Sequence, residues 1–134
     1  MATRSLIGKL NSDKTTVDYI YCHWDGYIGH NGKILHEHYN TLEKVDALLT
    51  LGDLSSLAEE IGEKQDFEDI KSHKDTWCLA YGRDRGETNV SVKTTTRKRY
   101  PKSHPYVECV YLYTEDGVWE VNSGDGWQLV EGLL

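Results

Sequence analysis

Residues 15–24 limit the fold more than any other part of the chain. They read Thr-Thr-Val-Asp-Tyr-Ile-Tyr-Cys-His-Trp, and such β-branched and aromatic residues are typical of a strand. Successive side chains of a strand point to opposite faces, so this strand is apolar on both faces. The two sets are Val17, Tyr19 and Tyr21, and Ile20, Cys22 and Trp24. We therefore expect a strand near the centre of a sheet that is covered on both sides.

Other segments add strands and helices around this one. Residues 5–10 precede a turn-forming Asn-Ser-Asp-Lys cluster, which predicts an N-terminal β-hairpin. Residues 107–113, 118–121 and 127–130 alternate with Asp-Gly turns, which predicts a C-terminal three-strand meander. Helical spacing predicts short helices over residues 34–39, 42–51 and 54–61, the last capped by Asp53. Residues 77–81 favour a short strand, and residues 88–100 fit either a strand or a mobile arm.

These elements predict one α+β domain spanning residues 1–134. We expect an antiparallel sheet, made of the hairpin and the meander, packed against two or three short helices. A chain of 134 residues is long enough to bury a core without a metal or disulfides. Its three cysteines, Cys22, Cys78 and Cys109, lie in apolar runs and form no Cys-x-x-Cys pair. We expect them to be reduced and buried.

Charge and hydropathy exclude several classes of protein. The net charge is −7, which argues against nonspecific nucleic-acid binding. Residues 1–70 hold six Lys or Arg and 13 Asp or Glu, whereas residues 71–134 hold nine of each. No apolar run reaches the roughly 20 residues of a membrane helix, and the first residues show no signal-peptide pattern. We expect a cytosolic protein without a cofactor.

The first candidate site is the segment that follows the central strand. Histidine is the usual proton-transfer side chain, Asp25 could orient His23, and Trp24 and Tyr27 offer rings for stacking. The alternative is a strand end whose aromatic rings belong to the core and whose aspartate caps a turn. Both interpretations remain open from the sequence.

The second candidate is the glycine-bounded turn over residues 81–86. Arg83 and Arg85 have the planar guanidinium groups that suit phosphate or carboxylate. The alternative is a solvated turn with a weak surface ion pair. Sequence does not tell whether this turn lies near Trp24 and Tyr27.

Two charged surfaces form the third candidate. Residues 93–102 contain Lys93 and four further cations around Tyr100, which suits either a solvated loop or a nucleic-acid contact. The acidic surface consists of Glu59, Glu60, Glu63 and Asp66. It is expected to face a partner protein, and the two opposite charges are also compatible with a homodimer.

Metal and enzyme chemistry have little support. The histidines at positions 23, 30, 36 and 38 have poor spacing for metal ligands, so we expect no metal site. No nucleophile-elbow, metalloprotease or paired-carboxylate motif is present. An enzyme that uses His23 and Asp25 remains an alternative.

Four segments resemble a family of small bacteriophage and prophage proteins. They are residues 2–8 (Ala-Thr-Arg-Ser-Leu-Ile-Gly), 21–27 (Tyr-Cys-His-Trp-Asp-Gly-Tyr), 51–57 (Leu-Gly-Asp-Leu-Ser-Ser-Leu) and 81–86 (Tyr-Gly-Arg-Asp-Arg-Gly). The family usually has proline after the tyrosine at position 27, where this chain has Ile28. The resemblance implies a phage accessory protein that acts in the host cytosol.

The leading prediction is therefore a non-enzymatic phage accessory protein. It would inhibit a bacterial host or defence factor by direct binding, as an anti-CRISPR or other anti-defence protein. The alternative is a binder that sequesters an anionic nucleotide signal, with Arg83 and Arg85 on the phosphate and Trp24 and Tyr27 stacked on the base.

Overall fold

The sheet is built around β1 (Ser5–Leu10) and β2 (Thr16–Cys22), which form the antiparallel hairpin predicted from the sequence. The computed structural model describes residues 2–134. The carboxylate of Asp13 fixes the turn, because it accepts the amide N–H groups of Thr15 at 2.8 Å and Thr16 at 2.9 Å.

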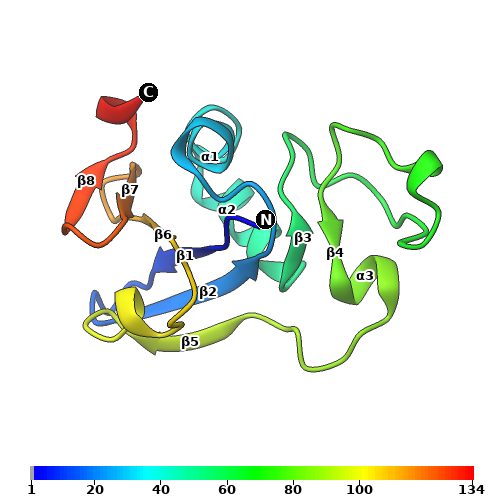
Figure 1. Ribbon diagram of the computed structural model, residues 1–134. Helices are drawn as coiled ribbons and strands as arrows, with labels where there is room; N and C mark the ends of the chain where they lie inside the picture. The colour runs from blue at the N-terminus through cyan, green and yellow to red at the C-terminus, as the bar shows by residue number, and fades with distance from the viewer. Residues whose placement is uncertain (1) are drawn as a thin grey trace.

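Eight strands form one mixed sheet (Figure 1). The remaining strands are β3 (Leu54–Ser56), β4 (Leu79–Ala80), β5 (Lys93–Thr96), β6 (Cys109–Tyr113), β7 (Trp119–Asn122) and β8 (Trp127–Leu129). Their order is β4-β3-β2-β1-β6-β7-β8, and β5 pairs with the first half of β2. The predicted α+β class and the C-terminal meander are confirmed. The sheet is mostly antiparallel, but β1 pairs with β6, and β2 with β3, in parallel.

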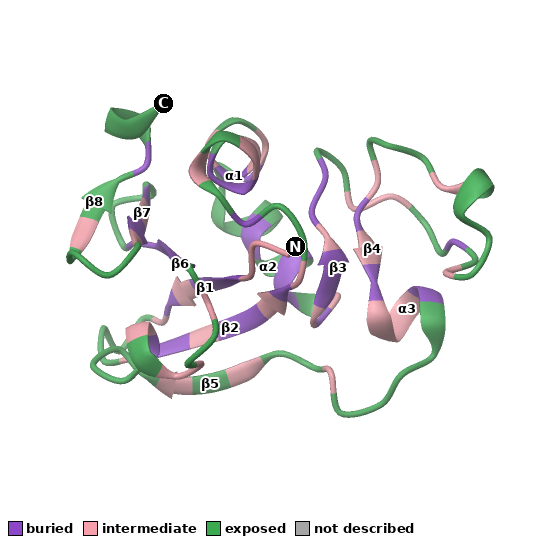
Figure 2. Cartoon of the chain, viewed as in Figure 1, coloured by how far each residue is buried: buried purple, intermediate pink, exposed green. Residues whose placement is uncertain are grey.

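The larger of two hydrophobic cores lies between the sheet and the helices. α1 (Lys33–His38) and α2 (Leu42–Thr50) cover this face, above β1 and β2 in Figure 1. Ile20 and Cys22 of β2 are fully buried in this core. The indole N–H of Trp119 donates to the carbonyl of Tyr39, just after α1, at 2.8 Å. Figure 2 shows buried residues on β1–β4, β6 and β7 and on the helices, whereas β5, β8 and the long loops are mostly pink or green.

The second core covers the opposite face of β2, as the two-sided pattern predicts. Val17 and Tyr19 pack there against Tyr100, which is fully buried. The Tyr100 hydroxyl donates to the carbonyl of Tyr111 at 2.6 Å, so this ring ties residues 97–107 onto the sheet. Tyr100 is therefore a core residue and is not available to stack on a nucleic-acid base.

Gly8 lets Tyr100 approach the sheet. A β-carbon at Gly8 would lie 2.6 Å from the Tyr100 hydroxyl oxygen and 2.8 Å from Cγ1 of Val17. We expect Gly8→Ala to lower the free energy of unfolding by about 1–3 kcal/mol, because the core is overpacked. Gly132→Ala is the matched control, since a β-carbon there meets nothing within 4 Å. Urea denaturation checks this, and equal stability of the two variants would contradict it.

The predicted helix over residues 54–61 is wrong. The Asp53 carboxylate accepts the amide N–H of Tyr21 at 2.9 Å and does not cap a helix. Leu54 instead pairs with Cys22, so that β3 adds a parallel strand beside the end of β2. Pairing across the sheet overrides the local helical spacing here.

Candidate functional site

The aromatic loop, defined here as residues 23–27, begins where β2 ends beside β3. The amide N–H of His23 donates to the Leu54 carbonyl at 3.0 Å, and that of Trp24 donates to the Ser55 carbonyl at 3.0 Å. Because β2 and β3 are parallel, their carboxyl ends meet at the same edge of the sheet. The first two residues of the loop are therefore held by ordered backbone.

Gly26 attaches the middle of the loop to two other segments. Its amide N–H donates to the Thr3 carbonyl at 2.7 Å, and its carbonyl accepts the Tyr111 hydroxyl at 2.6 Å. A β-carbon at Gly26 would lie 2.7 Å from the Thr3 carbonyl oxygen and from Cβ of Ser5, so glycine is required for this approach. Burial raises the pKa of Tyr111, which keeps its hydroxyl a donor. The aromatic loop is thus anchored at its start and its centre.

His23 contacts Tyr21 and not Asp25, the partner that the sequence suggested. Tyr21 Oη lies 2.8 Å from His23 Nδ1. Asp25 is exposed, and its φ of 57° puts its backbone in the left-handed region. The contact between Tyr21 and His23 could have been predicted from the sequence, because residues two positions apart in a strand lie on the same face. The structure therefore does not assemble the predicted His23–Asp25 pair.

Trp24 and Tyr27 are presented to solvent by this anchored loop. Trp24 is 43% exposed and Tyr27 is 49% exposed. The His23 ring packs edge-on against the Trp24 ring, with 4.7 Å between ring centroids. The ring centroids of Tyr27 and His30 are 6.0 Å apart. Two large rings on a held backbone form a surface that is suited to contact another molecule.

Arg83, a predicted anion-binding residue, is fully engaged within the protein. Nη1 donates to the carbonyls of Ile61 at 2.8 Å and Gly62 at 3.4 Å, and Nη2 donates to the carbonyl of Cys78 at 2.8 Å. Nε and Nη2 also donate to the Asp84 carboxylate, at 3.0 Å and 3.2 Å. These contacts use all the N–H groups of a guanidinium. Arg83 therefore joins two backbone segments, residues 61–62 and residue 78, to the Asp84 carboxylate and has no donor left for a ligand.

Asp84 is the anion at the centre of this network. Its buried carboxylate also accepts the amide N–H groups of Gln65 and Ala80, each at 2.8 Å. Burial by itself would raise the pKa of Asp84, but the hydrogen bonds from Arg83 and from the two amides outweigh it and hold the pKa below 3.8. The network therefore stabilises the charged carboxylate in the folded state.

This shift predicts a loss of stability in acid. A lowered pKa in the folded state means that Asp84 contributes stability above pH 3.8, its ordinary pKa, and loses it as the pH falls through the folded pKa. We expect Asp84→Asn to flatten the fall in unfolding free energy below about pH 4, although the variant is less stable overall. Urea denaturation at several pH values measures both slopes. Parallel slopes for the two proteins would contradict the prediction.

The predicted turn over residues 81–86 is a short helix, and it lies on the other side of β3 from the aromatic loop. β2 pairs with one edge of β3 and β4 with the other, and α3 (Tyr81–Arg85) follows β4 directly. Arg85 is partly exposed, with carboxylate oxygens of Glu68 at 3.9 Å and Glu87 at 3.7 Å. The structure does not bring the predicted phosphate-binding arginines together with the two exposed rings of the loop.

The acidic surface begins just after β3 and extends away from the aromatic loop, since Glu59 and Glu60 line a pocket beside α2 and Asp66 lines another with Arg85. Glu59 and Glu60 follow β3, whose carboxyl end lies beside that of β2. Glu63 and Asp66 continue along the exposed loop, and residues 59–69 hold six acidic residues and one lysine. Within residues 2–134, none of the four carboxylates of the acidic surface forms an ion pair. Their charge is therefore available to a partner.

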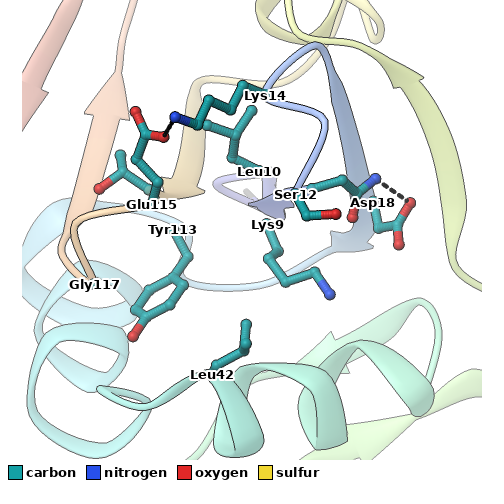
Figure 3. A pocket seen from close by; sticks show the side chains of 11 residues that line it. Lys9, Leu10, Ser12, Lys14, Asp18, Leu42, Tyr113, Glu115 and Gly117 are labelled. Carbon is teal, nitrogen blue, oxygen red and sulfur yellow. Dashed lines mark hydrogen bonds and ion pairs between the residues drawn. The ribbon is translucent and has the colours of Figure 1, made fainter.

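A groove of about 520 Å³ lies at the other end of β1, beside α2 (Figure 3). Both of its lysines are already paired, Lys9 with Asp46 at 2.6 Å and Lys14 with Glu115 at 3.1 Å, and Asp18 accepts hydrogen bonds from Asn11 and Thr94. Leu42 lies at its edge and is exposed. These pairs make the groove a weak candidate for a charged ligand.

The three cysteines are free and buried, as expected. Burial raises the pKa of Cys22 to about 12, so its thiol stays protonated at neutral pH. Burial likewise raises the pKa of Cys78. Because the thiolate is the nucleophilic form, neither of these two side chains suits covalent catalysis.

Three further findings bear on the class of protein. Within the described residues, no group of three or more His, Cys, Asp or Glu is arranged to hold a metal ion. No helix in residues 2–134 has the length and apolar character needed to cross a membrane. Comparison with protein-family models, with curated proteins and with solved structures found no match.

Proposed function

We propose that this chain is a non-enzymatic phage accessory protein that inhibits a bacterial host or defence factor by direct binding, as an anti-CRISPR or other anti-defence protein. The observation that supports this most is the anchored aromatic loop, which exposes Trp24 and Tyr27 at 43% and 49%. Tryptophan and tyrosine are enriched among the few residues that carry most of the energy of protein interfaces.

The anchoring of the loop favours binding. The backbone contacts of His23, Trp24 and Gly26 hold the loop before any partner arrives. A pre-organised loop loses little conformational entropy on association, so more of its contact energy appears as affinity. The resemblance of residues 21–27 to phage proteins supports a bacterial target.

The acidic surface supports a target that normally binds nucleic acid. Its four unpaired carboxylates lie on a chain of net charge −7, and the first two, Glu59 and Glu60, follow β3, which pairs with the end of β2. A cluster of negative charge competes for a basic groove that is built for phosphates, and it speeds encounter with that groove. The loop would supply affinity, and the acidic surface would supply orientation and rate.

Two other functions receive less support. An enzyme using His23 and Asp25 lacks the hydrogen bond between them, since His23 Nδ1 lies 2.8 Å from Tyr21 Oη. A nucleotide binder using Arg83 lacks free donors, because that guanidinium is occupied by three carbonyls and Asp84. Direct binding of a protein depends on neither arrangement.

Charge reversal on the acidic surface tests the proposal. In bacteria that carry defined defence systems, we expect the protein to restore phage plating against at least one system. Glu59→Lys with Glu60→Lys should abolish most of that protection, because like charges then meet a basic target. Asp125→Lys with Glu131→Lys, which makes the same charge change on exposed residues elsewhere, is the control.

The plating assay has two results that would contradict the proposal. One is that the protein protects phage against none of the systems. The other is that the Glu59→Lys with Glu60→Lys variant protects as well as the control variant and the natural chain. That result would exclude the acidic surface from the mechanism.

A further inference from the structure

A pocket of about 390 Å³ lies beside Tyr21, on the face of the sheet that holds the second core. The chain reaches it from several segments that are distant in sequence. The residues used below are Arg4, Tyr21, Asp53, Lys93, His104 and Tyr106. Of these, sequence reasoning identified only Lys93 as a candidate for an anion contact.

Arg4 is a cation of this pocket that lacks a protein partner. Its Nε is buried and has no hydrogen-bond partner among residues 2–134. The ion pairs of this part of the chain do not involve Arg4. Leaving a buried donor unpaired is unfavourable, and an anion that enters the pocket would compensate the charge of the Arg4 guanidinium, which lines it.

Lys93 and Asp53 form the second polar part of the pocket. Lys93 Nζ lies 3.2 Å from Asp53 Oδ2, and Asp53 Oδ1 accepts the Tyr21 amide N–H at 2.9 Å. Asp53 is thus held in place and balances the charge of Lys93. The charge of Arg4 remains uncompensated, so the pocket favours an anion although the whole chain is acidic.

Three aromatic rings, those of Tyr21, His104 and Tyr106, also line the pocket. The rings of Tyr21 and His104 are stacked, with centroids 6.3 Å apart and planes inclined by 28°. Tyr106 lines the same pocket and is 76% exposed, so its ring is not held in the core. Flat rings beside an unpaired guanidinium suit a ligand that has a planar ring as well as an anionic group.

We propose that this pocket binds a small phosphate-bearing molecule with a planar ring, of the size of a nucleoside monophosphate. Arg4 would hold the phosphate oxygens, because its planar fork matches them, and Lys93 would add a donor. The ring would lie against Tyr21, His104 and Tyr106. The pocket volume of about 390 Å³ lies within the range of small-molecule sites. This inference goes beyond the proposed function, since it uses neither Trp24 nor Tyr27.

Isothermal titration calorimetry of the full chain with AMP, GMP, CMP and UMP, and with inorganic phosphate, tests this. We expect at least one nucleotide to bind with a single site, and inorganic phosphate to bind at least about tenfold more weakly because it has no ring. Arg4→Gln should weaken nucleotide binding at least about tenfold. The affinity of Arg4→Lys should lie between those of the natural chain and Arg4→Gln. Tyr106→Ala should weaken it about three- to tenfold.

Arg97→Gln is the matched control, because it removes the same charge from an exposed arginine that does not line the pocket. It should change the affinity less than about twofold. If Arg4→Gln unfolds the chain, Tyr106→Ala carries the test, since this exposed ring contributes little to the core. The absence of a binding signal with all four nucleotides would overturn the proposal. So would equal effects of Arg4→Gln and Arg97→Gln, or equal affinity for inorganic phosphate.

Discussion

Replacing Arg83 by alanine is expected to lower the free energy of unfolding by about 3–5 kcal/mol, which corresponds to a fall in Tm of roughly 10–20 °C. The Asp84 side chain is 0% exposed and that of Arg83 is 18% exposed, so the substitution leaves a buried carboxylate without its cation. It also removes the hydrogen bonds to the carbonyls of Ile61, Gly62 and Cys78. Two segments of backbone, residues 61–62 and residue 78, would lose their common donor.

Arg85→Ala is the control for this prediction. Arg85 is 48% exposed and its two carboxylate contacts, at 3.9 Å and 3.7 Å, are long. Its loss should cost less than about 1 kcal/mol, as for exposed ion pairs in general. Arg83→Lys keeps the charge without the planar fork and should fall between the two variants. Chemical denaturation ranks the three, and equal stability of Arg83→Ala and Arg85→Ala would contradict the structural role.

The second large effect concerns binding and not stability. Trp24→Ala and Tyr27→Ala should each weaken the affinity for the partner protein by about thirtyfold or more, as central interface residues do. Both rings are about half exposed, and the loop is held by its backbone. We therefore expect the free energy of unfolding to change by less than about 1 kcal/mol in either variant.

Leu129→Ala is the control for these loop variants. Leu129 lies on β8, distant from the aromatic loop in the sheet order, and is 52% exposed. It should bind the partner as the natural chain does. Surface plasmon resonance with the purified partner gives all the affinities. A loop variant that binds like Leu129→Ala would exclude that ring from the interface.

Much of the sheet could be predicted from local sequence. The two-sided pattern of residues 15–24 placed β2 between two cores, and Asp-Gly turns marked the C-terminal meander. In these segments the turn residues and the alternation of apolar side chains favour the same structure. β3 was missed because Asp53 and the residues after it fit a capped helix locally. Their pairing with β2 depends on residues more than 30 positions away.

The candidate site was only partly predictable for the same reason. The exposed rings of Trp24 and Tyr27 lie where the glycine-containing loop suggested. Arg83 had the sequence context of a solvated turn, but its acceptors come from residues 61, 62 and 78, which the turn itself does not reveal. The Arg4 pocket joins residues far apart in the chain, and no spacing rule connects them.

Quantitative co-purification from a bacterial lysate tests most directly whether the protein acts by binding through the aromatic loop. The comparison uses the tagged natural chain, the Trp24→Ala with Tyr27→Ala variant, and Leu129→Ala. We expect at least one protein to be enriched at least about tenfold with the natural chain and with Leu129→Ala, and to be lost with the loop variant. The same set of proteins with all three, or no specific protein with the natural chain, would contradict the account.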